Sequence, residues 1–532
     1  MKEGDKYSTL SAVLGIVIGI LGTVLFFSVT RPSHKLNGDY SDWRKLNLIL
    51  EQVQENYVDT VDVKKVTDAA VVASLASLDP HSIYLPPVDL EKSESDLAGN
   101  FDGIGIQFNV PNDTAIVLEV IPGGPSEKVG LQPGDRLLKV DSTVIAGVKF
   151  PQDSMVRHMK GRAGTEVEVL VKRGKERIPF KIKRGKIPVH CVDAAFMIND
   201  TTGYIRLSKF SRTTYQEVKA AAENLLEQGL RNLLFDVRDN SGGYFDQALM
   251  LSDMFLEKGD EIVYLQGLHR KREAYKADGK GIMKDITLSV LINENSASSS
   301  EIFAGAIQDN DRGTIVGRRS YGKGLVQEPV YFNDGSGIRL TVARFYTPSG
   351  DFIENMRYIQ KPYSADYQYD IYKRYADGEM FDKDSMKVDK KEVYHTVGGR
   401  TVYGGGGIVP DVFVPVDTTL ASRFFIRCNK KATQMRFASY IFDKYAKQLS
   451  EIDDYKKLDA FLDGLNIPSA FQSYAASVDG IRPAAGEWAE TEEYLIPQLR
   501  ALIGRYSKLS DNAFYRIYLR IDPVVKAALE NE

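Results

Sequence analysis

One lysine and a cluster of serines carry the clearest chemical signal in this sequence. Val290–Gln327 contains five serines, and Lys323 lies between two glycines near the end of this segment. A serine hydroxyl transfers an acyl group when a base removes its proton and hydrogen-bond donors stabilise the oxyanion that forms. A lysine acts as that base when burial lowers its pKa far enough to leave the amine neutral. We therefore predict an acyl-transfer centre here, with Lys323 as its base.

Histidine is an alternative base, and the chain contains six: His34, His81, His158, His190, His269 and His395. None of them lies at a predicted strand end beside the serine cluster, and none begins an HExxH zinc motif. A Ser-His-Asp triad stays open as an alternative, because the members of a triad need not be neighbours in sequence.

Parts of the same segment also fit other roles. A serine in Asn295–Glu301 is in a typical position to cap a helix, and a lysine on a Gly-flanked turn is commonly solvated. Gly317–Gly324 fits the GxxxxGK pattern of a phosphate-binding loop that follows a strand. However, Gly324 stands where such a loop carries the Ser or Thr that holds Mg²⁺, which argues against nucleotide binding.

The elements around the serine cluster alternate between strand and helix, which predicts an α/β core with a mainly parallel sheet. Ligand sites in such sheets gather beyond the carboxyl ends of the strands. The loops Asp236–Gly243 and Asn293–Ser300 should therefore meet at one edge. We expect strands at 203–207, 232–237, 261–265, 286–292 and 314–316, and helices at 214–228, 245–256 and 298–308.

Residues 96–186 have a different texture, with short β-branched runs separated by glycine and proline. Phe101–Phe108 is a Gly-rich turn that enters a strand, and Gly130–Asp135 is a Gly-Leu-x-Pro-Gly-Asp turn. This order of elements resembles a PDZ domain. The resemblance implies that a peptide C-terminus binds as an added strand beside Ile104–Phe108. The loop that binds the peptide's carboxylate, together with the start of the strand beside the peptide, would comprise Gly103, Ile104, Gly105 and Ile106.

Three motifs resemble the C-terminal processing (tail-specific) peptidases, which are serine proteases with a PDZ domain inserted before a crotonase/ClpP-like core. The motifs are NSASSSEI at 295–302, YGKGLVQ at 321–327 and DVRDNSGG at 236–243. In this family the nucleophile precedes the base by 25 positions, and Ser298 stands 25 residues before Lys323. The resemblance therefore implies that Ser298 is the nucleophile and Lys323 the base.

The resemblance also assigns supporting groups. Gln327 would orient Lys323, and the N–H of Ser299 would form an oxyanion hole with that of Gly242 or Gly243. The implied activity is a serine endopeptidase that captures the exposed C-terminal tail of a protein or peptide substrate. No metal or organic cofactor is expected. The competing interpretation is a PDZ-based tail-binding scaffold or adaptor in which proteolysis is vestigial.

This sequence departs from the family pattern at two positions of the motifs. Ser299 stands where the family commonly has alanine, which leaves the backbone N–H in place. In the PDZ-like region, Lys160 stands where an arginine usually precedes the glycine, so the resemblance assigns no regulatory contact to this position.

The N-terminus predicts a membrane anchor. Thr9–Val29 is a run of 21 residues without a charge. At about 1.5 Å per residue it can cross a bilayer core of about 30 Å. Ser28–Thr30 matches a signal-peptide cleavage site poorly, so an uncleaved helix is expected. We interpret the chain as a single-pass protein of a bacterial inner membrane, with its catalytic body on the periplasmic side.

The predicted fold is multidomain α/β, with a crotonase/ClpP-like catalytic core, an inserted PDZ-like β domain, helical modules at both ends and one N-terminal transmembrane helix. The helical regions are candidates for homo-oligomerisation or adaptor binding. A net charge of −4 offers no basic surface for nucleic acid, and the two cysteines signal neither a zinc site nor a disulfide framework. The expected divisions are 1–30 (tail and anchor), 40–95 (helical module), 96–186 (PDZ-like), 187–416 (core, with a polar insertion at about 351–395) and 417–532 (helical domain).

Overall fold

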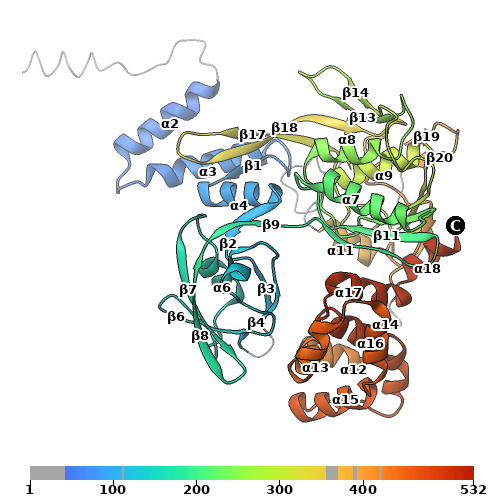
Figure 1. Cartoon of the computed structure of the whole chain (residues 1–532). Coiled ribbons are helices and arrows are strands. Elements are labelled where there is room, and N and C mark those ends of the chain that lie inside the picture. Colours follow the sequence, from blue (N-terminus) through green and yellow to red (C-terminus); the bar gives the residue numbers. More distant parts are fainter. Residues whose placement is uncertain (1–41, 111–112, 355–368, 387–391, 418–421, 532) are drawn as a thin grey trace, which may run out of the picture. The chain divides into compact units, whose positions relative to one another are not determined.

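The computed structural model describes residues 42–110, 113–354, 369–386, 392–417 and 422–531 (Figure 1). The predicted anchor at residues 9–29 therefore lies outside the described residues. Within the described ranges, no helix is both long and apolar enough to cross a membrane.

The chain divides into two units, residues 1–74 and 75–532. The described part of the first unit contains α2 (Asp42–Asn56) and most of α3 (Val63–Ala76), which confirms the helical pattern predicted there. The α3 helix ends shortly before Asp79-Pro80, because the residue before a proline is disfavoured in the helical conformation.

The PDZ-like module predicted at 96–186 is built on an antiparallel sheet in which β3 (Ile106–Asn109) is an end strand. Val167, Val169 and Val171 alternate with exposed residues along β7, so one face of the sheet forms the core of the module. From β3 the order continues with β4 (Ala115–Val120), β5 (Arg136–Val140), β7 (Glu166–Arg173) and β8 (Glu176–Lys183), and β6 (Thr143–Val144) pairs with β5. The remaining elements are β2 (Asn100–Gly103), β9 (Gly185–Pro188), α5 (Pro125–Lys128) and α6 (Gln152–Met159).

The α/β core confirms the predicted parallel sheet. Its order is β10 (Val192–Met197), β11 (Thr202–Leu207), β12 (Asn232–Asp236), β15 (Thr287–Ile292), β16 (Thr314–Gly317) and β21 (Val412–Phe413), with β10 antiparallel to β11 and the others parallel. Leu233 and Phe235 pack on the helices α7 (Thr214–Glu227), α8 (Phe245–Asp253) and α9 (Ser299–Asp309). Leu234 faces the opposite side, where a second apolar cluster forms. Both faces of the sheet are thus buried.

One predicted strand belongs to another sheet. The segment β13 (Glu261–Gln266) is a strand, but its place in the parallel sheet was a wrong prediction. It pairs antiparallel with β14 (Glu273–Lys276) and β18 (Gly337–Tyr346), and β18 in turn pairs with β1 (Ile83–Leu85) and β17 (Leu325–Tyr331). The prediction failed because alternation of strand and helix along the chain does not specify which strands pair. The second sheet matters for the site, since its strand β17 begins directly after the Lys323 loop.

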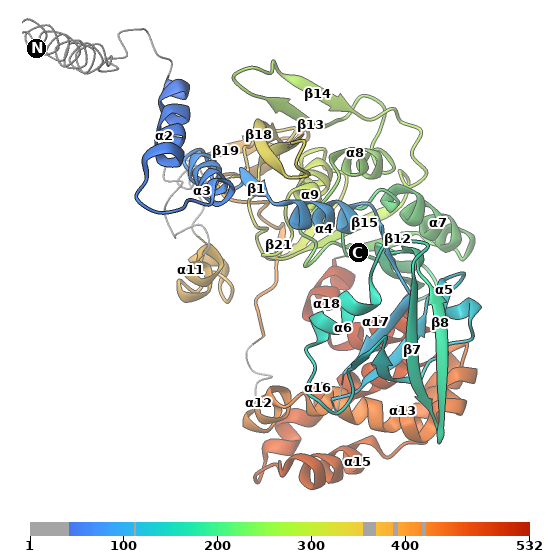
Figure 2. The same cartoon turned by 90° about the vertical axis from the view of Figure 1, so that its left-hand side faces the viewer.

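The C-terminal helices confirm the predicted helical region. Most of them share one apolar core. The last helix is an exception: Val524, Val525 and Ala528 pack on the core sheet against Leu234 and Leu291. Figure 1 and Figure 2 both place α18 at the sheet, away from α12 and α15. The helices are α12 (Arg423–Lys430), α13 (Thr433–Glu451), α14 (Tyr455–Asp463), α15 (Ile467–Tyr474), α16 (Glu487–Gly504), α17 (Ser510–Tyr518) and α18 (Pro523–Glu530).

The predicted insertion at 351–395 has structure of its own in its described part. It contains α11 (Asp370–Ala376), a short 3₁₀ turn (Lys383–Ser385) and β19 (Val393–His395), which pairs with β20 (Thr401–Tyr403). Residues 355–368 and 387–391 lie outside the described ranges.

Candidate active site

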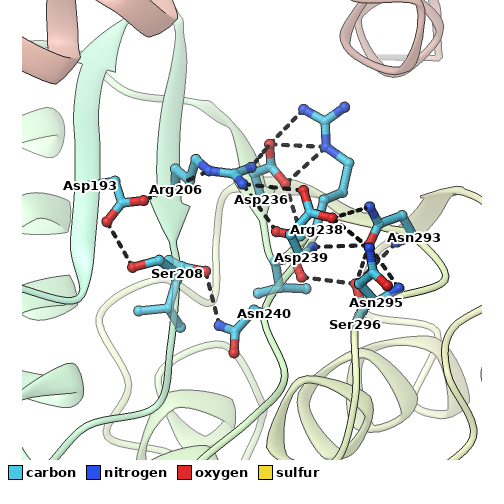
Figure 3. A network of polar contacts seen from close by, with 12 residues as sticks. Asp193, Arg206, Ser208, Asp236, Arg238, Asp239, Asn240, Asn293, Asn295 and Ser296 are labelled. Atoms are coloured by element: carbon cyan, nitrogen blue, oxygen red, sulfur yellow. Dashed lines mark hydrogen bonds and ion pairs between the residues drawn. The ribbon is translucent and has the colours of Figure 1, made fainter. Parts of the chain in front are cut away.

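The loops that follow β12 and β15 meet at the carboxyl edge of the sheet, as expected. Asp239 links them, because its N–H donates to Asn293 Oδ1 at 2.9 Å and its carboxylate accepts from Asn295 Nδ2 at 2.9 Å (Figure 3). The N–H of Ala297 also donates to the carbonyl oxygen of Asn240 at 3.0 Å. The two loops therefore form one hydrogen-bonded platform beside Ser298.

Ser298 has a strained backbone. It occupies the N-cap position of α9 with φ 55° and ψ −113°, a conformation that a residue with a side chain adopts only when its surroundings hold it there. Its neighbour Gly242 leaves no room for a side chain: a Cβ on Gly242 would lie 2.8 Å from Ser298 Cβ and 2.9 Å from the nitrogen of Ser299. The serine is partly exposed, so its turn presents it at the surface of the platform.

A single buried carboxylate joins the Ser298 turn to the Lys323 loop. Glu301 on α9 accepts hydrogen bonds from the N–H groups of Ser298 at 2.8 Å, Gly322 at 2.6 Å and Lys323 at 2.9 Å. It also accepts one from the hydroxyl of Ser320 at 2.5 Å. Burial raises the pKa of Glu301, and these four donors oppose that rise. Glu301 was not among the predicted site residues, although Ser298-x-x-Glu301 has the pattern of a capping box.

Lys323 is partly buried, in the loop between β16 and β17. Burial lowers its pKa, and the positive charge of Arg339 acts in the same direction, while the charge of Glu354 opposes them. Its Nζ donates to Gln327 Oε1 at 3.3 Å. Within the described part of the chain, no hydrogen bond joins Nζ to the Ser298 hydroxyl. The structure thus brings Lys323 and Gln327 together, with the amine shifted toward its neutral form.

Gln327 on β17 and His81 just before β1 lie beside the lysine. Gln327 lies on β17, and its Nε2 donates to the backbone carbonyl oxygen of His81. The ring of His81 contacts Glu354 Oε1 at 2.7 Å through Nε2. The other carboxylate oxygen, Oε2, accepts the N–H of Gly324 at 2.9 Å. His81 therefore contacts the surroundings of the lysine, a role that the sequence did not indicate.

The two glycines of the 236–243 loop differ in their free donors. The N–H of Gly242 donates to Asn240 Oδ1 at 2.9 Å. For the N–H groups of Gly243 and Ser299, the described residues offer no hydrogen-bond acceptor. The hydroxyl of Ser299 donates to the carbonyl oxygen of Gly243 at 3.1 Å, which places these two residues side by side. Gly243, rather than Gly242, thus pairs with Ser299 as a source of two free N–H donors.

A buried ion network holds the 236–243 loop. Arg238 Nη2 lies 2.6 Å from Asp236 Oδ2, and Arg206 Nη1 lies 3.0 Å from the same oxygen (Figure 3). Burial alone would raise the pKa of Asp236, but the charges of Arg238 and Arg206 outweigh it and lower the pKa to about 2. Arg238 Nη1 also lies 2.8 Å from Asp522, the N-cap residue of α18. The C-terminal end of the chain therefore helps to fix this loop.

The Lys323 loop does not have the free donors of a phosphate-binding loop. A phosphate loop offers its backbone N–H groups to the nucleotide. Here the N–H groups of Gly322, Lys323 and Gly324 all donate to the carboxylates of Glu301 and Glu354. These donors are occupied, which contradicts the alternative of nucleotide binding at this loop.

The predicted peptide-binding residues lie at the start of the PDZ-like module. Gly103 ends β2, Ile106 begins β3, and Gly105 between them has φ 76°, a value that favours glycine. Ile104 is buried in the core of the module. Because β3 is an end strand of its sheet, its outer edge is in the position that an added strand requires.

The sequence comparisons with known proteins agree with this architecture. Residues 201–361 match the model of peptidase family S41, and residues 103–183 match that of the PDZ domain. A probable CtpA-like serine protease of Staphylococcus haemolyticus is 32% identical over 344 residues, which cover 64% of this chain and 68% of the relative. A probable CtpA-like serine protease of Staphylococcus aureus is 31% identical over 354 residues, with 65% and 70% covered. Among solved structures, the photosystem II D1 C-terminal processing protease has 27% identity and a TM-score of 0.37, with 72% of this chain and 88% of that chain covered.

Proposed function

Because the chain belongs to peptidase family S41 and is a PDZ-containing serine protease, we propose that it processes the C-terminal regions of proteins by means of a Ser298–Lys323 dyad. The observation that carries this proposal is the Glu301 carboxylate, which binds the backbone of both residues. A nucleophile and a base on one rigid support fit the demands of covalent catalysis.

The proposed reaction has two stages. The hydroxyl oxygen of Ser298 attacks the peptide carbonyl carbon while neutral Lys323 takes its proton. The C–N bond then breaks, and the Lys323 ammonium returns a proton to the departing amine. Water attacks the acyl-enzyme in the same way, with Lys323 again as base, and releases Ser298. The N–H groups of Gly243 and Ser299 would stabilise the oxyanion in both stages.

Lys323 must move toward Ser298 in this scheme. Its amine is bonded to Gln327, and catalytic hydrogen bonds are often completed only when substrate binds. We infer that the hydrogen bond to Gln327 holds the Lys323 amine in a resting position. Peptide binding would then bring Nζ within hydrogen-bond distance of the Ser298 hydroxyl.

The PDZ module is proposed to select the substrate. A peptide with a free C-terminus would add to the outer edge of β3, and its carboxylate would bind at Gly103–Ile106. The substrate class is therefore proteins with an exposed, unstructured C-terminal tail.

Membrane attachment is a separate part of the proposal and depends on the apolar run at 9–29. We propose that this run anchors the protein once in a bacterial inner membrane, with the catalytic body on the periplasmic side. Carbonate extraction and protease accessibility in spheroplasts test this. Release of the full-length protein by carbonate, or its protection from protease in spheroplasts, would contradict it.

The function is tested with one peptide that has a free apolar C-terminus and a twin with an amidated C-terminus. The wild type should cleave the free peptide with the lower KM, and Ser298→Ala and Lys323→Ala should cleave neither. Binding of the free peptide without cleavage by the wild type would instead support the tail-binding scaffold.

A further inference from the structure

The insertion at 351–395 contacts the segment that leads to Lys323. Arg374, on α11, is 4% exposed. Its Nη1 donates to the carbonyl oxygen of Ser320 at 2.9 Å, and its Nη2 donates to that of Arg319 at 2.6 Å. A guanidinium that binds two consecutive carbonyl groups fixes the direction of the backbone between them.

Glu379 completes this contact. Its carboxylate accepts from Arg374 Nε at 2.8 Å, and from Arg319 Nε at 2.8 Å and Nη2 at 2.6 Å. Arg319 Nη1 also donates to the carbonyl oxygen of Gly406 at 2.6 Å. Glu379 is 4% exposed and Arg319 is 8% exposed. Buried charges are tolerated only when they are paired and hydrogen-bonded, so loss of one member disturbs the whole set.

The contact reaches the catalytic residues through Ser320. This fully buried residue donates its hydroxyl to Glu301 Oε1 at 2.5 Å and accepts the N–H of Ile408 at 2.6 Å. Glu301 in turn binds the N–H groups of Lys323 and Ser298. An unbroken series of hydrogen bonds thus runs from the insertion to the proposed base and nucleophile.

We propose that Arg374 and Glu379 are positioning residues for Lys323, and that the insertion is an integral support of the catalytic loop. This inference rests on the proposed function of the Ser298–Lys323 dyad. Without the pair, the backbone at 319–320 loses its support, and the Lys323 amine no longer meets Ser298 in the orientation that proton transfer needs. A misplacement of about 1 Å can lower a rate by about 100-fold.

The test compares Arg374→Ala with a matched control, Arg312→Ala. Arg312 also binds backbone carbonyl groups, those of Phe255, Met283 and Ile286, at 2.8, 2.7 and 2.7 Å. It follows the C-terminal end of α9, whereas Ser298 lies at the N-terminal end. Both variants should lower the Tm. With rates measured equally far below each Tm, only Arg374→Ala should lower kcat, by about 100-fold, with KM within about twofold.

Two further measurements separate positioning from general stability. Methylguanidinium at millimolar concentration should restore part of the kcat of Arg374→Ala, and methylammonium should not, because the planar fork makes the contact. If Arg374→Ala does not fold, Arg374→Lys is used instead, because it keeps the positive charge but not the planar guanidinium. We expect Arg374→Lys to fold and to have a lower kcat than the wild type.

The possible outcomes distinguish this inference from the proposed function. A wild type that needs Lys323, combined with an Arg374 variant whose kcat equals that of Arg312→Ala, would overturn the inference alone. A wild type that cleaves no tail peptide, or a Lys323→Ala variant that cleaves at the wild-type rate, would instead overturn the proposed function.

Discussion

Glu301 and Lys323 are joined through the backbone: the buried carboxylate of Glu301 accepts the N–H of Lys323 at 2.9 Å. The same carboxylate accepts the N–H of Ser298, so one side chain determines where both proposed catalytic residues lie. This arrangement explains how a turn with a positive φ at Ser298 persists in the folded protein.

Glu301→Gln tests this shared support. An amide nitrogen in place of one carboxylate oxygen faces N–H and O–H donors, and each buried donor that loses its acceptor costs about 1–3 kcal/mol. We expect the free energy of unfolding to fall by about 3 kcal/mol and kcat by about 100-fold, as measured by urea unfolding and peptide cleavage. Glu257→Gln is the control, since its side chain is 66% exposed. An unchanged kcat in Glu301→Gln would show that the carboxylate does not align the dyad.

Glu354→Gln tests the electrostatics of the lysine. The charged groups that act on Lys323 are Glu354, Arg339, Glu301 and Asp79, and the charge of Glu354 raises the pKa that burial lowers. Removal of that charge should lower the pKa of Lys323 further. Because the base acts when neutral, the acid limb of the kcat/KM profile should move to lower pH. A limb that stays in place or moves to higher pH would contradict the assignment of Lys323 as base.

Asp522→Asn tests the contact between the last helix and the 236–243 loop. Asparagine caps a helix as well as aspartate does, so this variant removes only the charge that faces Arg238. We expect a loss of about 1–3 kcal/mol in the free energy of unfolding, because a buried guanidinium loses its charged partner.

The matched control for this variant is Asp454→Asn, the exposed N-cap of α14, which should leave the free energy of unfolding nearly unchanged. Equal effects of the two substitutions would show that the Arg238–Asp522 pair adds nothing beyond capping. A kcat that falls in Asp522→Asn alone would extend the role of the pair to the oxyanion hole proposed at the 236–243 loop.

Local patterns made much of the core predictable. The strand at 287–292, the helix from Ser299 and the strand at 314–317 follow from apolar runs and a polar loop, each read within a short window. The meeting of the 236–243 and 293–300 loops follows from the geometry of parallel strands. The spacing of Ser298, Lys323 and Gln327 is also local to one segment, which is why a family resemblance could assign their roles.

Contacts between distant segments were not predictable. Three such contacts are the hydrogen bonds of Glu301, the Arg238–Asp522 ion pair and the hydrogen bond from Arg374 to Ser320. Each joins residue types that have many ordinary roles, so the sequence alone does not indicate the contact. The strand β8 is a different case, because Ile178, Phe180 and Ile182 alternate along it toward the core of its sheet and are a local strand signal that our prediction did not use. The prediction that β13 joins the parallel sheet was wrong, because tertiary packing decides which strands pair.

The most direct test of the account compares Ser298→Ala with Ser299→Ala in cleavage of a peptide with a free apolar C-terminus. Both residues are serines at the start of α9, but only Ser298 is proposed to attack, whereas Ser299 contributes its backbone N–H, which alanine keeps. Ser298→Ala should lower kcat by at least about 10⁴-fold, and Ser299→Ala should stay within about threefold of the wild type, since a neutral hydrogen bond contributes only about 1 kcal/mol. A Ser298→Ala variant that cleaves at the wild-type rate, or a Ser299→Ala variant that is inactive while Ser298→Ala is active, would contradict the account.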